Sequence, residues 1–203
     1  MTGNEKPKVG GIVLAAGGSS RLGGPKQLLQ FKGKSLLRHA AEAMSASICD
    51  PAVVVLGAES ERSAKEIEGL AVTVCVNEDW RSGMSSSINA GLAKLIEIEP
   101  DLDAVLVSLC DQPLITAEML DRFVERFRVS DSAVVAASYN GVYGVPALFS
   151  RKMLVELSKL EGDKGARNLI RNCSDIATID LPEATVDIDT HIDAARFGIT
   201  KSE

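Results

Sequence analysis

The sequence lacks the features that mark membrane, secreted, metal-cage and nucleic-acid-binding proteins. No apolar run in its 203 residues approaches the roughly 20 residues of a membrane span, and no signal-peptide core follows the polar start. The four cysteines, Cys49, Cys75, Cys110 and Cys173, form no C-x-x-C pair, which favours buried, reduced thiols. A net charge of −6 with scattered Lys and Arg disfavours nucleic-acid binding. We therefore expect a cytoplasmic protein that binds neither membranes nor nucleic acids.

Several familiar catalytic and phosphate-binding patterns are also missing. Counting from Gly17 or Gly18 gives no Walker A pattern, and the dinucleotide fingerprint G-x-G-x-x-G is absent. No Ser-His-Asp or Cys-His arrangement is recognisable. His39 and His191 have no partner at metal-ligand spacing, so we expect both to be structural.

The order of apolar segments predicts a three-layer α/β/α sandwich around a mainly parallel sheet. With 45% apolar residues the chain is long enough to bury such a sheet. We expect a single domain over residues 1–203. Hydrophobic periodicity predicts strands over 9–16, 52–56, 72–76, 104–110, 133–137, 147–149, 176–179 and 185–188, and a loop over 139–144. It predicts helices over 35–46, 60–69, 85–98, 116–127, 151–160 and 166–171, then a terminal helix, with Ser35, Ser60 and Thr116 as N-caps.

The stretch from Leu14 to Leu29 carries the strongest functional signal. Glycines after the first predicted strand allow backbone N–H groups to approach an anion closely, and Arg21 and Lys26 add positive charge. This combination favours a nucleoside triphosphate. The plainer alternative is a tight connection with two solvated basic residues.

Two groups of carboxylates favour a Mg²⁺ site. Asp111 directly follows an apolar strand, and Asp187 and Asp189 alternate on a predicted strand, so that both face one side. Two carboxylates on one face are unfavourable without a cation or hydrogen bonds. A turn aspartate and a harmless surface pair are the alternatives.

The segment from Asn77 to Ser87 forms a third polar cluster at a strand end. It contains Trp80 and then a helix start with Ser85, Ser86 and Ser87, whose N–H and hydroxyl groups suit a phosphate or ribose. Alternatively, Trp80 packs at the domain edge and Ser85 only caps the helix. Ligands of parallel sheets bind beyond the carboxyl ends of the strands. The polar clusters at residues 17–26, 77–87 and 111–113 are therefore all expected at one edge of the sheet.

Taken together and in order, these motifs resemble the molybdenum cofactor cytidylyltransferase group of MobA-like nucleotidyltransferases. The loop L-A-A-G-x-S-x-R-x-G-x-P-K runs from Leu14 to Lys26. The other matching segments are Asn77-x-x-Trp80-x-x-Gly83-Met84-x-x-Ser87, Asp111-Gln112-Pro113, Gly144-x-Pro146-x-x-Phe149, Gly162-Asp163-x-Gly165-Ala166-Arg167 and Asp187-Ile188-Asp189-Thr190. The resemblance implies a nucleotide-diphospho-sugar transferase fold and transfer of CMP from CTP to a molybdopterin-type acceptor with Mg²⁺. It also implies a nucleotide-binding half of about 8–115 and an acceptor-binding half of about 116–200.

The resemblance also implies roles for individual residues. Nucleotide binding falls to Leu14, Ala15, Ala16, Gly17, Gly18, Ser19, Arg21, Lys26, Asn77, Ser86 and Ser87. Arg21, Lys26 and Asp111 are the implied catalytic residues, and Asp111, Asp187 and Asp189 the implied metal ligands. Acceptor binding is implied for Trp80, Gly83, Gln112, Gly144 and Pro146. Small molecules are thus the expected partners, with a molybdoenzyme as recipient of the product, and the chain is expected to be a monomer or small homo-oligomer.

Ala16 favours cytidine, since guanylyl relatives tend to have L-A-G-G where this chain has Leu14-Ala15-Ala16-Gly17. Two departures from the cytidylyl pattern stand out: Gly144-Val145-Pro146 replaces Gly-His-Pro or Gly-Asn-Pro, and Thr190-His191-Ile192-Asp193 replaces Thr-Pro-Glu-Asp. The first bears on the acceptor, the second on a helix entry. A guanylyltransferase, a sugar- or alcohol-phosphate nucleotidyltransferase and a non-catalytic cofactor-binding or insertion module remain the alternatives.

Overall fold

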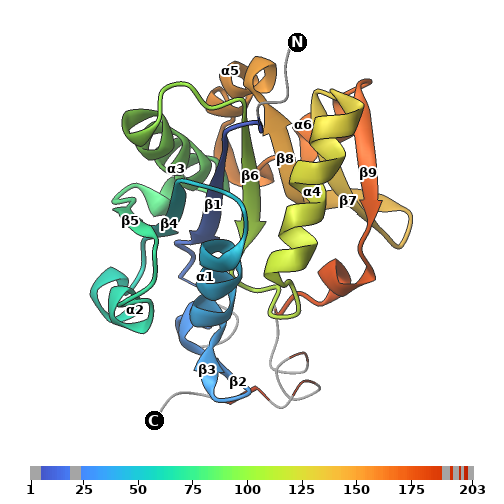
Figure 1. Cartoon of the computed structure of the whole chain (residues 1–203). Helices are drawn as coiled ribbons and strands as arrows, with labels where there is room; N and C mark the ends of the chain where they lie inside the picture. Colours follow the sequence, from blue (N-terminus) through green and yellow to red (C-terminus); the bar gives the residue numbers. More distant parts are fainter. Residues whose placement is uncertain (1–5, 19–23, 189–192, 194–196, 198, 201–203) are drawn as a thin grey trace.

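A seven-stranded, mostly parallel sheet forms the centre of the molecule in the computed structural model (Figure 1). The structure describes residues 6–18, 24–188, 193, 197 and 199–200. The strand order is β5-β4-β1-β6-β8-β7-β9. Only β8 runs against its neighbours, pairing antiparallel with both β6 and β7. The predicted fold class is therefore confirmed.

The sheet strands are β1 Val9–Ala15, β4 Ala52–Leu56, β5 Thr73–Val76, β6 Ala104–Leu109, β7 Val134–Tyr139, β8 Val142–Ser150 and β9 Ile176–Asp180. The α-helices are α1 Leu36–Ala46, α2 Ser60–Glu66, α3 Met84–Ile98, α4 Ala117–Ser130, α5 Leu154–Ser158 and α6 Arg167–Asn172. A small hairpin, β2 Gln30–Phe31 and β3 Lys34–Ser35, lies beyond the sheet, and 3-10 turns include η2 Lys26–Leu28, η3 Trp80–Ser82, η5 Gly162–Lys164 and η6 Pro182–Thr185.

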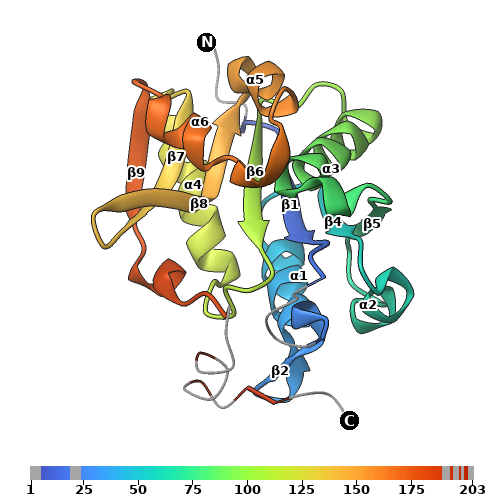
Figure 2. The ribbon, with the colours of Figure 1, turned by 180° about the vertical axis from the view of Figure 1, so that it is seen from behind.

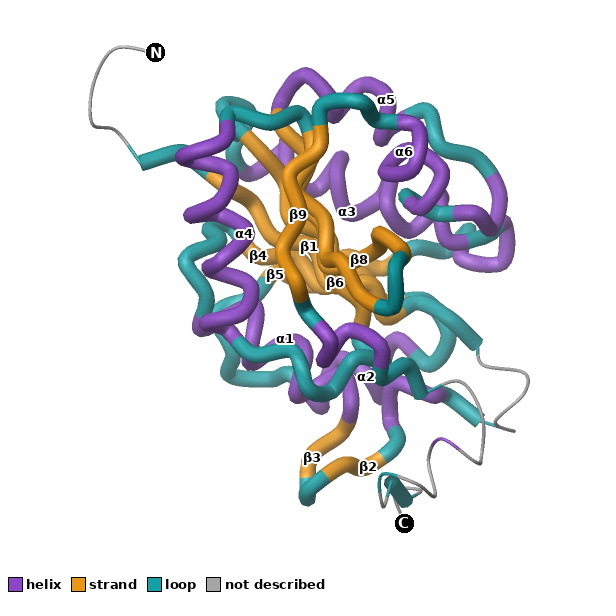
Figure 3. The backbone as a smooth tube through the Cα atoms, turned by 90° about the vertical axis from the view of Figure 1, so that its right-hand side faces the viewer, coloured by secondary structure: helices purple, strands orange, loops and turns teal. Residues whose placement is uncertain are grey.

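Helices cover both faces of the sheet because its strands alternate their apolar side chains between two cores. Val13 of β1 packs in the core that contains α1 and α4 residues. Ile12 and Leu14 point the other way, into the core formed with α3, α5 and α6. The layers separate clearly when the sheet is viewed along its edge (Figure 3), and the view from behind shows α3, α5 and α6 over the second face (Figure 2).

The N-caps are partly as predicted. Ser35 caps α1 by accepting a hydrogen bond from the Arg38 N–H, and Thr116 caps α4 in the same way. The prediction for Ser60 is wrong, since α2 begins at Ser60 and its N-cap is Glu59. Helix α3 begins at Met84, so Gly83 rather than Ser85 holds its N-cap position.

The loop predicted over 139–144 and the strand predicted over 185–188 are both wrong. Tyr139 ends β7 and Val142 begins β8, so most of the predicted loop is a β-hairpin whose turn is Asn140-Gly141. Residues 182–185 form the 3-10 turn η6, and no strand follows through residue 188. The expected terminal helix lies almost wholly outside the described residues.

After the last strand, the chain returns to the β2–β3 hairpin and the start of α1. Ile188 packs with Phe31, Leu36 and Ile199, and Gln30 exchanges backbone hydrogen bonds of 2.8 and 3.0 Å with Thr200. The β2–β3 hairpin is thus tied to the far end of the sequence. Among the described residues, no helix has the length and apolar character needed to cross a membrane.

Candidate active site

Polar segments follow the carboxyl ends of β1, β4, β5 and β6, all at one edge of the sheet. Gly17, Gly57, Asn77 and Asp111 each come within two residues of a strand end. Parallel pairing of these strands brings their carboxyl ends together. The expected gathering of separate clusters at one edge is therefore confirmed.

The loops that follow β1 and β4 pack tightly against Trp80. A side chain on Gly18 would come within 2.7 Å of the indole ring, and one on Gly57 within 2.7 Å of the Trp80 Cβ. Gln27 is buried and donates a 2.9 Å hydrogen bond to the Ala58 carbonyl, which fixes the end of the loop. Ser19 and Arg21, both assigned to the nucleotide, lie outside the described residues.

Lys26 and Asp111 form an ion pair at this edge of the sheet. Their Nζ and Oδ2 atoms are 2.6 Å apart, and the two side chains are only 14% and 16% exposed. Asp111 Oδ1 is buried and has no hydrogen-bond partner among the described residues. A buried carboxylate oxygen without a partner is costly, which fits an atom that binds a ligand.

Asp187 joins Asp111 through the backbone rather than through a strand. The Ile188 N–H donates to the Asp111 carbonyl oxygen at 3.2 Å, so the two carboxylate-bearing segments touch. Asp111 and Asp187 line the same cavity. Asp189 lies outside the described residues, so its place on a common face with Asp187 stays a prediction.

These two carboxylates suit Mg²⁺, which binds one or two carboxylates together with substrate phosphates and water. The described residues contain no cluster of three or more His, Cys, Asp and Glu side chains able to enclose a metal.

Asn77 and Ser86 act within the protein scaffold. Asn77 Nδ2 donates to the hydroxyls of Ser86 and Ser87 at 2.9 and 3.1 Å, and its Oδ1 accepts from the Asp79 N–H. Ser87 lines the large cavity. Asn77 and Ser86 line neither cavity described below and instead join the end of β5 to the start of α3.

Two adjoining cavities open at this edge. The larger, about 680 Å³, is lined by Leu14, Ala15, Ala16, Gly17, Lys26, Gln27, Trp80, Arg81, Gly83, Met84, Ser87, Leu109, Cys110, Asp111, Asp163, Arg167 and Asp187. The Arg81 guanidinium lies 4.3 Å from the Trp80 ring centroid, so this wall is flat and cationic. We name this the nucleotide cavity, because it contains most of the described residues assigned to the nucleotide.

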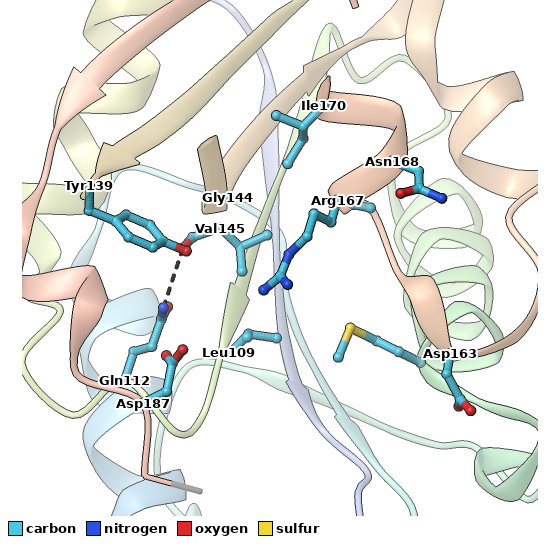
Figure 4. Close-up of a pocket in the computed structure, with 12 residues that line it drawn as sticks. Leu109, Gln112, Tyr139, Gly144, Val145, Asp163, Arg167, Asn168, Ile170 and Asp187 are labelled. Carbon is cyan, nitrogen blue, oxygen red and sulfur yellow. Dashed lines mark hydrogen bonds between the residues drawn. The ribbon is translucent and has the colours of Figure 1, made fainter. Parts of the chain in front are cut away.

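The smaller cavity, about 360 Å³, extends under β8 and α6 (Figure 4). Its walls are Met84, Leu109, Gln112, Tyr139, Gly144, Val145, Asp163, Ala166, Arg167, Asn168, Ile170 and Asp187. We name it the acceptor cavity, because Gln112 and Gly144 were assigned to the acceptor. Trp80 and Gly83, assigned likewise, line the nucleotide cavity instead, and Pro146 is buried and lines neither.

Gln112 is held rigidly in the wall of the acceptor cavity. Its Nε2 donates to the carbonyl oxygens of Val145 at 3.3 Å and Ala184 at 3.0 Å, and the residue is 1% exposed. The first of these bonds is the dashed line in Figure 4. Its Oε1 has no partner among the described residues, so the amide retains one unused acceptor.

Tyr139 and Gly144 shape the same wall. The phenol occupies the space that a Gly144 side chain would need. Burial, and after it the negative charge of Asp187, raise the pKa of the Tyr139 phenol. It therefore remains protonated and able to donate a hydrogen bond.

Tyr139, Asp163 and Arg167 are among the cavity residues that received no role from the sequence. Asp163 and Arg167 stand in a glycine-rich motif, which was the available signal. Tyr139 was expected in a loop, and nothing in its neighbours indicated that a hairpin would bring it to the acceptor cavity.

Comparison with known proteins agrees with this geometry. Residues 11–178 match the model of the MobA-like NTP transferase domain. The chain is 32% identical to nicotine blue oxidoreductase of Paenarthrobacter nicotinovorans, with 88% of this chain and 93% of that one covered. It is 26% identical to the molybdenum cofactor guanylyltransferase of Vibrio cholerae, over 92% and 90% of the two chains.

Solved structures share the whole architecture. Rv0371c from Mycobacterium tuberculosis superposes with a TM-score of 0.78 at 27% identity, covering 95% of this chain and 98% of that one. A manganese complex of Rv0371c gives a TM-score of 0.73 at 26% identity, covering 94% and 97%. The chain belongs to the MobA-like NTP transferase family of nucleotidyltransferases.

Proposed function

We propose that this protein transfers CMP from CTP to the phosphate of molybdopterin, with Mg²⁺ and release of pyrophosphate. The observation that carries the proposal is the shared wall between the nucleotide and acceptor cavities. Met84, Leu109, Asp163, Arg167 and Asp187 line both of them. Two substrates bound in adjoining cavities meet at that wall, which supports direct transfer between them.

The nucleotide side of the proposal rests on the loop after β1. Ala16 is buried and lines the nucleotide cavity, so its methyl group takes space that a glycine would leave to a base. This favours a pyrimidine over a purine and supports CTP. Lys26 and Arg81, with Arg21 as the sequence predicts, would neutralise the triphosphate.

The acceptor side rests on the chemistry of its cavity. Leu109, Val145 and Ile170 supply apolar walls that suit a flat heterocycle. The unused Oε1 of Gln112 suits a ring N–H, and the protonated Tyr139 suits a ring acceptor atom. A pterin offers both kinds of group.

Asp111 and Asp187 would hold the cation, with Asp189 as a further predicted ligand. When bound, a divalent cation would offset the negative charge of the phosphates. Asp111 now pairs with Lys26, so this chain already keeps a positive charge where the cation is expected.

The reaction needs no general base from the protein. An oxygen of the acceptor phosphate is anionic and attacks the α-phosphorus of CTP in line. The bond from the α-phosphorus to the oxygen bridging the α- and β-phosphates breaks, and pyrophosphate leaves with that electron pair. The side chains only orient the substrates and offset charge, which fits a site of Lys, Arg and carboxylates.

Pyrophosphate release with CTP, GTP, UTP and ATP in parallel, each with molybdopterin and Mg²⁺, tests the proposal. We expect release with CTP to exceed release with GTP by about tenfold or more, the scale of discrimination set by a methyl-sized difference in a pocket. Faster release with GTP would identify a guanylyltransferase, the activity named for the Vibrio cholerae relative. Release only with a sugar or alcohol phosphate would replace the acceptor.

A second candidate follows from the relative named nicotine blue oxidoreductase. In that case the nucleotide cavity would bind a reduced nicotinamide nucleotide and the acceptor cavity a flat electron acceptor. Oxidation of NADH or NADPH by a quinone dye, with no pyrophosphate release from any nucleotide, would favour it. Binding of molybdopterin without either reaction would favour a binding or insertion module, whose recipient, as for the transferase, is expected to be a molybdoenzyme.

A further inference from the structure

The wall shared by the two cavities contains a single cation among the described residues. Met84 and Leu109 are apolar, Asp163 and Asp187 are carboxylates, and Arg167 is the remaining member. In a transfer between the cavities, the attacking phosphate of the acceptor must lie at this wall. Arg167 is therefore the cation that an anion at this wall meets from the wall itself.

The Arg167 guanidinium is directed at the centre of the acceptor cavity (Figure 4). The guanidinium forms no ion pair or hydrogen bond with another residue that the structure describes, although Asp163 and Asp187 line the same cavity. By contrast, Lys26 is paired with Asp111, and Arg81 stacks on Trp80. Arg167 is therefore a cation whose fork of N–H donors is not committed within the described structure, a geometry that matches a phosphate.

The backbone segment that leads to Arg167 packs closely against the start of α3. A side chain on Gly83 would come within 2.6 Å of the Gly162 carbonyl and of Asp163 Oδ1. One on Gly165, whose φ is +53°, would come within 2.6 Å of Met84 Sδ. The two glycines let the 162–167 segment pack onto the start of α3, so the position of Arg167 is fixed relative to the nucleotide cavity.

We propose that Arg167 binds the phosphate of the acceptor and selects acceptors that carry a phosphomonoester. This inference rests on the proposed function and adds to it the residue that recognises the nucleophile. The negative charge of Asp163 at the same wall repels anions that do not bind to Arg167. The heterocycle of the acceptor then extends from Arg167 toward Gln112 and Tyr139.

Equilibrium binding tests this assignment without turnover. Molybdopterin and its dephosphorylated form are titrated into the protein with Mg²⁺ and a CTP analogue that carries a methylene bridge between the α- and β-phosphates. We expect the wild type to prefer the phosphorylated form by about 10- to 100-fold, the range for hydrogen bonds to a charged group. Arg167→Ala should bring this ratio close to one, and Arg167→Lys should restore part of it.

Arg171→Ala is the matched control, because Arg171 is exposed on the same helix and lines neither cavity. Binding of the CTP analogue, followed by the fluorescence of Trp80, the one tryptophan of the sequence, should be unchanged in Arg171→Ala. Because Arg167 also lines the nucleotide cavity, a cooperative thermal unfolding transition, and not nucleotide binding, shows that its variants are folded.

Each outcome decides between the two hypotheses. An unchanged ratio in Arg167→Ala, or an equal loss for both forms of the acceptor, overturns the role of Arg167 and leaves the proposed transfer intact. A collapsed ratio in Arg167→Ala, together with no pyrophosphate release by the wild type from CTP, supports Arg167 and overturns the transfer. If the wild type binds neither form, the acceptor class and the role of Arg167 are both wrong.

Discussion

Lys26 and Asp111 are paired with each other, although the proposed reaction requires a different partner for each of them. Their Nζ and Oδ2 atoms are 2.6 Å apart. A cation on Asp111 would displace Lys26, and the triphosphate would then receive the lysine charge. Under the proposed function, each of the two ligands would free the partner of the other, so cation and nucleotide binding would be mutually favourable.

Lys26→Ala should reduce nucleotidyl transfer by about 100-fold or more, the cost of losing a charge that stabilises a transition state. The free energy of unfolding should fall by less than about 2 kcal/mol, because the ion pair with Asp111 belongs to two partly exposed side chains. Mn²⁺ should bind the nucleotide-free variant more tightly than the wild type, since Asp111 loses its competitor. Transfer kinetics, urea denaturation and titration calorimetry measure the three quantities.

Lys34→Ala is the control for this variant, because Lys34 forms a comparable 2.7 Å ion pair with Glu42 away from both cavities. It should leave transfer and Mn²⁺ binding unchanged. Transfer by Lys26→Ala at the wild-type rate would show that the assigned role is wrong.

At the scale of elements, Gly83 is the point where the two halves of the site meet. It occupies the N-cap position of α3 with φ +114° and ψ 174°, a region that side chains other than glycine rarely enter. The Gly162 carbonyl and Asp163 lie where its Cβ would be. Both the backbone angle and the close approach therefore require glycine here.

Gly83→Ala should lower the free energy of unfolding by about 2–5 kcal/mol, from backbone strain together with the displaced 162–163 turn. Gly24→Ala should change it by less than about 1 kcal/mol, because nothing lies within 4 Å of the added methyl group and the backbone has no positive φ. Thermal and urea denaturation compare the two variants. Equal stability of Gly83→Ala and the wild type would contradict the packing described for this turn.

The sequence predicts an element well where its apolar pattern is compatible with only one kind of secondary structure. The strand over 9–16 is predicted almost to the residue, since it is buried along its whole length. The strand expected over 185–188 has similar β-branched residues, but a 3-10 turn over 182–185 overlaps its start and residues 186–188 form no strand. Local pattern does not reveal which sheet edge a short segment can reach.

The candidate site divides in the same way. Lys26 and Asp111 are prominent in sequence because each follows a buried strand within a recognisable motif. Tyr139 reaches the acceptor cavity only through a hairpin with a register shift between Ala136 and Ala137. Arg167 projects from a six-residue helix whose position depends on Gly83 and Gly165. These placements are set by tertiary packing, which spacing along the chain does not encode.

At the scale of the whole molecule, two buried thiols link stability to alkaline pH. Burial raises the pKa of Cys49 and of Cys110 from an ordinary value of 9.0 to about 12. Between these values the folded chain retains protons that the unfolded chain releases. The contribution of both thiols is thus fully present below pH 9 and is lost as the pH rises toward 12.

The free energy of unfolding should therefore fall by about 1.4 kcal/mol per pH unit for each thiol above pH 9. Urea denaturation under reducing conditions between pH 8 and 10.5 measures this slope. The double variant Cys49→Ala, Cys110→Ala should begin less stable at pH 8 but show a shallower decline. The same slope in the variant and the wild type would assign the alkaline loss to other groups.

Because β8 runs in the reverse direction, the wall of the acceptor cavity can change during evolution independently of the nucleotide cavity. Because β8 runs antiparallel to β6, it enters the sheet at the ligand-binding edge, and the Asn140-Gly141 turn before it lies next to the acceptor wall. Insertions at that turn would lengthen this wall without altering the register of β1 with β4 or β6. Under the proposed function, relatives with this fold could therefore differ in the acceptor that they bind and still use the same nucleotide.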